Sequence, residues 1–172
     1  MRRKSHRYRF QLLHEWLVSH YAPQKAADVG GGKGLLAYLL IQSGWDVTVI
    51  DPAPQILPRT FKNLQKVRTT LNIDKRGQIN RIDKPFEIDM AMDYQMLMGL
   101  HSHGSNLKII DACAKYKKNF ILLPCCVIDE PIEIKADINW LESLVIYAEE
   151  KGFKVGREML GFKGQDTIIY SL

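Results

Sequence analysis

Asp28-Val29-Gly30-Gly31-Gly32-Lys33-Gly34 is the stretch that decides the fold of this chain. A short strand-like run, residues 26–29, leads into it, and a helix-like run, residues 35–41, follows it. A second strand-like run, residues 47–50, then ends in Asp51. The order strand, glycine turn, helix, strand and acid is typical of a doubly wound sheet that holds a nucleoside. Glycines let the backbone turn tightly and approach a ligand, and the acid can accept hydrogen bonds from both ribose hydroxyls.

The acid at the start of this motif indicates which kind of nucleoside is bound. A dinucleotide site prefers the pattern G-x-G-x-x-G, with a helix N-terminus directed at the pyrophosphate. Here Asp28 stands two residues before the first glycine, where it repels a phosphate and suits a cation such as the ammonium of an amino-acid tail. The inferred ligand carries a ribose and an amino acid but no phosphate, and S-adenosylmethionine fits. A glycine-rich turn without a ligand and an NAD site are the alternatives.

With this motif the chain resembles the class I S-adenosylmethionine-dependent methyltransferases, over about residues 24–172. The resemblance implies an α/β, Rossmann-like sheet of seven strands, mostly parallel, with the last strand inserted antiparallel between its neighbours and helices on both faces. It implies S-adenosylmethionine as the cofactor, with the glycine motif at the methionine part, Asp51 at the ribose and Asp83 at the adenine. The cofactor-binding residues that follow are Asp28, Gly30, Gly31, Gly32, Gly34, Asp51, Pro52, Asp83 and Gly99.

Length and composition indicate one globular domain. The chain has 172 residues, with 46% hydrophobic and 25% charged residues, which is enough to bury a core without disulfides or metals. No apolar run reaches the length of a membrane span, and the N-terminus lacks the apolar core of a secretion signal. The three cysteines include the adjacent pair Cys125-Cys126, which is no disulfide framework, so we expect a reducing cytoplasm.

The positive charge is concentrated at the N-terminus. Lys and Arg total 24 against 19 Asp and Glu, and the whole excess of five lies in the first nine residues, which contain no acid. Localised positive charge beside Tyr8 and Phe10 is typical of an arm that contacts phosphates, so we expect RNA as a partner; a solvated leader is the alternative. The cations of this arm are Arg2, Arg3, Lys4, Arg7 and Arg9.

Periodicity predicts the remaining elements. We divide the chain into the basic arm with an N-terminal helix, residues 1–22, and a methyltransferase domain, residues 23–172. Alternating strands and helices favour a parallel sheet, and a closing hairpin favours one antiparallel strand. The expected helices cover residues 5–20, 34–43, 59–70, 106–116 and 138–151. The expected strands cover residues 25–29, 47–50, 78–82, 95–100, 119–123, 154–160 and 167–172, and residues 125–136 are expected to form a loop.

Two turns at the carboxyl ends of strands carry a second resemblance. They are Gly99-Leu100-His101-Ser102-His103-Gly104, after the expected fourth strand, and Pro124-Cys125-Cys126, after the fifth. A group of methyltransferase-like domains has similar turns, and some of its members are linked to tRNA ribose methylation. The resemblance implies a tRNA substrate, although His103 stands where that group usually has a cysteine.

These turns also contain the candidate catalytic residues. Exocyclic amine methylation is disfavoured, because the Asn/Asp-Pro-Pro-aromatic turn that this chemistry uses is missing after the fourth strand. Methylation of pyrimidine C5 needs a thiolate, for which Cys125 or Cys126 has the right position; a buried, inert cysteine is the alternative. A ribose hydroxyl or a ring nitrogen needs only a base and correct placement, and His101, with an unperturbed pKa near neutrality, is the candidate base or else fixes the loop.

Other functions remain open. A zinc site built from both histidines and both cysteines is chemically possible, but the spacing matches no standard finger, and we predict no metal. The preferred function is methyl transfer to RNA, with tRNA favoured and a ribose or ring atom as the acceptor. A small-molecule methyltransferase and a non-catalytic partner subunit that keeps the fold are the rivals.

Overall fold

A computed structural model describes residues 3–72, 74, 77–125, 129–132 and 138–172. In these residues seven strands form one sheet in the order β5-β2-β1-β6-β7-β9-β8. All run parallel except β9, which pairs antiparallel with β7 and with β8. The predicted α/β fold with an inserted antiparallel last strand is therefore confirmed. The strands are β1 (Lys25–Val29), β2 (Asp46–Ile50), β5 (Asn80–Ile82), β6 (Met96–Leu100), β7 (Asn119–Leu123), β8 (Val155–Met159) and β9 (Thr167–Ser171).

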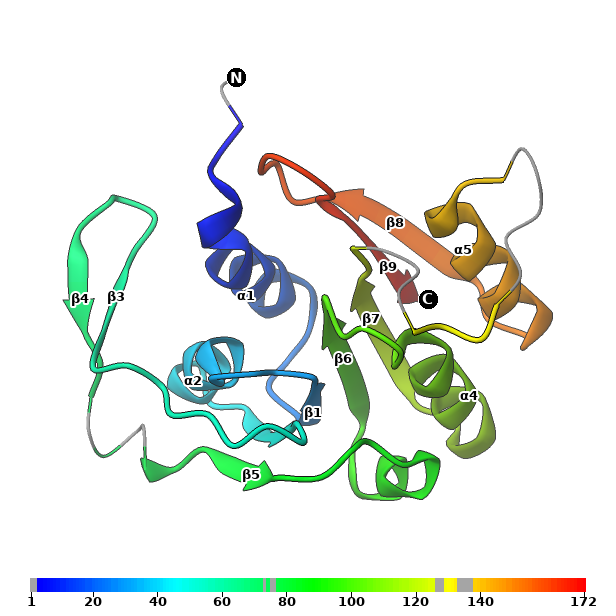
Figure 1. Cartoon of the computed structure of the whole chain (residues 1–172), viewed down its shortest axis with the longest axis horizontal. Helices are drawn as coiled ribbons and strands as arrows, with labels where there is room; N and C mark the ends of the chain where they lie inside the picture. The colour runs from blue at the N-terminus through cyan, green and yellow to red at the C-terminus, as the bar shows by residue number, and fades with distance from the viewer. Residues whose placement is uncertain (1–2, 73, 75–76, 126–128, 133–137) are drawn as a thin grey trace.

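Helices cover both faces of the sheet (Figure 1). The central strands are buried on both sides, so alternate residues feed two cores. In β6, Met96 and Met98 pack against the helices on one face of the sheet, whereas Leu97 packs against the helices on the other face. The first face carries α1 (Arg9–His20) and α2 (Leu35–Gln42), and the second carries η2 (Ile88–Asp93), α4 (Asn106–Tyr116) and α5 (Trp140–Glu150). No helix among the described residues is long and apolar enough to cross a membrane.

The N-terminal arm is fixed to the domain. After η1 (His6–Tyr8), helix α1 buries Leu13 and Leu17 in the same core as α2 and β6. The backbone of Lys4 pairs with the loop between β8 and β9: its N–H donates to Gly161 at 3.0 Å, and its carbonyl accepts from Lys163 at 2.9 Å. The division of the chain at residue 22 stays a prediction, but both parts contribute to one core.

The predicted helix over residues 59–70 is wrong. This segment is an antiparallel hairpin of β3 (Thr60–Lys62) and β4 (Arg68–Thr70). Asn63 nucleates the turn, because its side chain accepts the Val67 N–H at 2.9 Å, and Lys66 adopts a left-handed backbone with φ of 65°. β-branched residues then favour extended backbone on both sides of the turn. Local side-chain chemistry thus overrides a weak helical pattern.

The other elements agree with the sequence to within a few residues. Helix α4 and strand β7 have the predicted bounds, and Met96 and Met98 are buried. The expected loop, residues 125–136, is described only in part. Glu130 from this loop accepts the Asn106 N–H at 2.8 Å and the Leu107 N–H at 3.3 Å, so it caps the N-terminus of α4.

Phe162 connects the arm to the core and gives a test of this packing. Its side chain is fully buried, and truncation leaves a cavity that the paired backbone cannot fill. We expect Phe162→Ala to lower the free energy of unfolding by about 3–5 kcal/mol in urea denaturation. The control is Lys163→Ala, because Lys163 is the exposed residue next to Phe162. We expect it to change the free energy of unfolding by less than about 0.5 kcal/mol. Equal losses in both variants would contradict this packing.

Candidate nucleoside-binding site

Asp51 organises the glycine loop at the carboxyl edge of the sheet. One carboxylate oxygen accepts the Gly32 N–H at 2.9 Å, and the other accepts the Ala53 N–H at 2.8 Å. Gly30 donates to the Ile50 carbonyl at 2.8 Å, and Gly30 and Gly32 have φ of 68° and 53°, which favour glycine. Each carboxylate oxygen keeps a second lone pair, so Asp51 can also accept hydroxyl donors from a ligand.

Arg81, which the sequence analysis missed, fixes the loop from the far side. It lies in β5, and its guanidinium donates to the Gly32 carbonyl at 2.8 Å and to the Ala53 carbonyl at 3.4 Å. Its Nε also donates to Asp83 at 3.3 Å. The fork of the guanidinium thus joins the glycine loop to the segments after β2 and β5. No sequence motif marks such a contact, because it depends on the pairing of β5 with β2.

Asp28 lies beneath the loop rather than in an open cavity. It is 1% exposed, and its Oδ2 is buried without a hydrogen-bond partner among the described residues. A Cβ on Gly31 would lie 2.5 Å from this oxygen, so only glycine fits above it. Burial, followed by the charge of Asp51, raises the pKa of Asp28 to about 7, although Arg81 opposes the shift. The carboxyl is therefore a buried acid beneath the loop that is about half protonated near neutral pH.

Two cavities adjoin the loop and meet at Gly30 and His101. The first, which we call the nucleoside cavity, has a volume of about 450 Å³, with Asp51 and Pro52 on one side and Pro85 and Phe86 on another. The second, which we call the aromatic cavity, has a volume of about 440 Å³ and lies under the N-terminal helix. Its lining includes the side chains Arg9, Phe10, Leu57, Phe61 and His101.

The nucleoside cavity fits the adenosine part of S-adenosylmethionine. Asp51 presents carboxylate lone pairs to it, as ribose hydroxyls require. Pro52, Pro85 and the buried Phe86 supply the apolar wall that an adenine needs. Asp28 does not reach this cavity, because Gly31 covers its buried carboxyl. Phe86 and Pro85 were missed from the sequence, because the chain between residues 71 and 93 has no clear pattern.

His101 lies where the two cavities meet. Its backbone is left-handed, with φ of 53°, and its N–H donates to Leu123 at 3.0 Å. Its Nε2 is buried without a partner among the described residues. Burial, followed by the charges of Arg9, His6 and His103, lowers the pKa of His101 to about 4. The pKa of His101 therefore lies below its unperturbed value, so the imidazole is neutral at physiological pH and a weak base.

Cys125 contacts His103 across the ends of β7 and β6. The Cys125 Sγ and the His103 Nε2 are 3.0 Å apart, as in a thiol beside a base. The predicted candidate Cys126 lies outside the described residues. Among the described residues, no group of three or more His, Cys, Asp or Glu side chains is placed to hold a metal ion.

Four of the predicted cofactor residues do not line either cavity in the part of the chain that the structure describes. Asp28 is buried, and Gly34 begins α2 with φ of 82°. Asp83 is exposed and pairs with Arg81. Gly99 is packed: a Cβ there would lie 2.6 Å from the Ser102 Oγ and 2.8 Å from Ile109. Gly30, Asp51 and Pro52 line the nucleoside cavity, and Gly31 and Gly32 line the aromatic cavity.

The sequence matches no protein-family model. It also matches no curated protein.

Several solved structures with a similar fold are methyltransferases. Precorrin-6y C5,15-methyltransferase from Geobacter metallireducens GS-15 is 16% identical over 94% of this chain and 84% of that one, with a TM-score of 0.55. Magnesium protoporphyrin IX methyltransferase from Synechocystis PCC 6803, with bound SAM, is 14% identical over 96% of this chain and 78% of that one, with a TM-score of 0.55. The glycopeptide N-methyltransferase MtfA, complexed with S-adenosyl-L-homocysteine, is 12% identical over 97% of this chain and 90% of that one, with a TM-score of 0.59. The chain has the class I methyltransferase fold.

The buried carboxyl of Asp28 gives a pH-dependent prediction. Its pKa in the folded state, about 7, lies above the unfolded value of 3.8, so the native state binds more protons between these values. The free energy of unfolding therefore falls as pH rises through this window, by on the order of 4 kcal/mol from this group. Asp28→Asn removes the titration, so we expect a flatter profile between pH 4 and pH 7 in urea unfolding.

An exposed acid on the neighbouring strand serves as the control. Asp46→Asn, at the opposite end of β2, should keep the wild-type profile. An Asp28→Asn profile as steep as that of the wild type would show that Asp28 is not the titrating group.

Proposed function

We propose that this protein is an S-adenosylmethionine-dependent methyltransferase. The observation that carries the proposal is the corner formed by Asp51 and the glycine loop, which opens on a nucleoside cavity in a methyltransferase fold. In this proposal Asp51 holds the ribose, Pro52 and Phe86 contact the adenine, and the loop around Gly30 holds the methionine part. When bound, the cofactor supplies an electrophilic methyl group on its sulfonium.

The residues around the aromatic cavity position the acceptor. His101 lies at the junction of the two cavities and is neutral above about pH 4, so it can accept a hydrogen bond or a proton from an acceptor without first losing its own. Its low pKa makes strong general-base catalysis unfavourable. Most of the rate enhancement would therefore come from holding the acceptor atom in line with the methyl group.

The acceptor we propose is RNA, with tRNA favoured and a ribose or ring atom as the target. Of the basic arm, Arg3, Lys4 and Arg7 are exposed, and Arg2 lies outside the described residues. Arg9 differs, because it is partly buried, with its guanidinium 4.2 Å from the centre of the Phe10 ring, and it lines the aromatic cavity. The compartment we propose is the cytoplasm, because the three cysteines are too few for a disulfide framework.

A thiol-dependent mechanism is a second candidate for the chemistry on RNA. Cys125 lies beside His103, which can take up its proton. A thiolate formed there could add to C6 of a pyrimidine ring, so that C5 attacks the donor methyl group; loss of the C5 proton to a base would then expel the thiolate and restore the ring. If Cys125 acts in this way, Cys125→Ala abolishes transfer, whereas a ribose or ring-nitrogen acceptor leaves most of the activity in that variant.

Donor binding is the first consequence to test. Replacing Asp51 with Ala removes the acceptors of two loop N–H groups and of the ribose hydroxyls, so we expect S-adenosylmethionine to bind about 100-fold more weakly in titration calorimetry. Asp46→Ala, an exposed acid at the start of the same strand, is the control and keeps wild-type affinity. Wild-type protein that binds no donor would overturn the proposed function.

Methyl transfer identifies the acceptor. Purified protein is incubated with S-adenosylmethionine carrying a labelled methyl group, and with either total tRNA or a small-metabolite extract. Label in tRNA is the expected result, and nucleoside analysis then separates ribose from ring methylation. Label only in the extract contradicts the RNA acceptor and favours a small-molecule enzyme. Label in neither, with donor bound, favours the non-catalytic partner subunit.

A further inference from the structure

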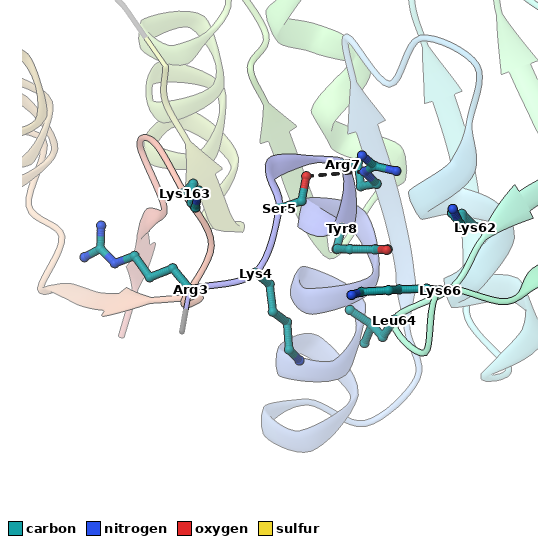
Figure 2. Close-up of a pocket in the computed structure, with 9 residues that line it drawn as sticks. All are labelled: Arg3, Lys4, Ser5, Arg7, Tyr8, Lys62, Leu64, Lys66 and Lys163. Atoms are coloured by element: carbon teal, nitrogen blue, oxygen red, sulfur yellow. Dashed lines mark hydrogen bonds between the residues drawn. The ribbon is translucent and has the colours of Figure 1, made fainter. Parts of the chain in front are cut away.

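A basic groove lies beside the site, between three segments that are far apart in the sequence (Figure 2). The N-terminal arm, the β3–β4 hairpin and the loop between β8 and β9 form its walls, and its volume is about 600 Å³. None of its described lining residues is acidic, and six are exposed cations: Arg3, Lys4, Arg7, Lys62, Lys66 and Lys163. Half of this set was not part of the arm identified from the sequence.

Specific contacts hold the three walls together. The backbone pairing of Lys4 with the loop around Phe162 joins the arm to the C-terminal hairpin. The buried side chain of Gln11, in α1, donates to the Lys62 carbonyl at 3.0 Å and so fixes the β3–β4 hairpin to the helix. Tyr8, which is 5% exposed, forms part of the floor. The groove is therefore defined by the fold rather than by freely moving tails.

The cations of the groove are left without neutralising partners. None of the six forms an ion pair with a carboxylate of the described residues. Cations gathered without counter-charges repel one another and lower the stability of the folded state. A bound polyanion removes this repulsion and releases its own counterions, which makes binding favourable.

The groove shares two walls with the aromatic cavity. Along the arm, Arg7 lines the groove, whereas Arg9 and Phe10 line the cavity. In the hairpin, Lys62 lines the groove, and its neighbour Phe61 lines the cavity. A strand held in the groove thus lies next to a slot with two aromatic side chains, and aromatic rings are suitable partners for an unstacked base.

We propose that this groove binds consecutive phosphates of an RNA strand and so presents one of its nucleosides to the aromatic cavity. The inference rests on the proposed function for the fate of that nucleoside, but strand binding can be measured without methyl transfer. Six cations exceed what a single phosphate requires, and a concave groove fits a strand better than a flat anionic membrane.

Neutralising the hairpin cations tests the groove. Binding of a fluorescein-labelled single-stranded RNA of about 12 nucleotides is measured by anisotropy at several salt concentrations. With six phosphate contacts, the slope of log affinity against log salt is about −4 for the wild type. We expect the double variant Lys62→Gln/Lys66→Gln to bind more weakly and to show a slope of about −3, because two contacts are lost.

The matched control removes the same charge elsewhere. Lys117 and Lys154 are exposed and lie just before β7 and β8, at the amino ends of these strands and away from the groove. Lys117→Gln/Lys154→Gln should therefore keep a slope near the wild-type value. Equal slopes in the two double variants would overturn the groove. So would binding to phosphatidylserine vesicles that is tighter than binding to the RNA, since it would assign the cations to a membrane surface.

Donor binding in the same preparations separates the two proposals. If S-adenosylmethionine binds normally but the Lys62→Gln/Lys66→Gln variant binds RNA as tightly as the wild type, the proposed RNA-binding groove is wrong and the methyltransferase assignment stands. If RNA binds as predicted but no donor does, the groove stands and the proposed function fails.

Discussion

The two hydrogen bonds from the Gly32 and Ala53 N–H groups to Asp51 are the constraint on which the site depends. They hold the glycine loop against the end of β2, and they place a carboxylate with free lone pairs one strand away from the switch between β1 and β6. In an open α/β sheet this crevice is the place where ligands bind. Arg81 supports the same loop from β5, so three strands fix one turn.

This constraint is achieved at some cost to stability, because the site keeps charged or polar groups away from water. Asp28 is buried with one unpartnered oxygen, and His101 has a buried, unpartnered Nε2. A buried polar atom without a partner destabilises the folded state by about 1–3 kcal/mol. His101 lines both cavities, where a ligand can supply the missing partner, whereas Asp28 lines neither cavity.

The N-terminal arm has a different role from that of a simple tail. Alternate parts of it contact the aromatic cavity and the basic groove, and its backbone pairs with the C-terminal hairpin. His6 packs edge-on against His101, with ring centres 5.1 Å apart, so the arm shapes the environment of the candidate catalytic residue. One short segment therefore lines both the basic groove and the aromatic cavity and contacts His101.

Sequence reasoning succeeded where local pattern determines structure. The glycine motif and the alternating elements predicted the fold, and helix α4 has its predicted bounds. It failed over residues 59–70, where the turn at Asn63 outweighs helical periodicity. It also missed Arg81 and the low pKa of His101, because both depend on burial and on residues distant in the chain. The groove could not be predicted for the same reason.

A crystal structure of the protein with S-adenosyl-L-homocysteine tests the central claim most directly. The account predicts that both ribose hydroxyls donate to Asp51 and that the adenine lies in the nucleoside cavity beside Pro52 and Phe86. A ligand bound elsewhere, or a cavity that stays empty at saturating concentration, would contradict the account.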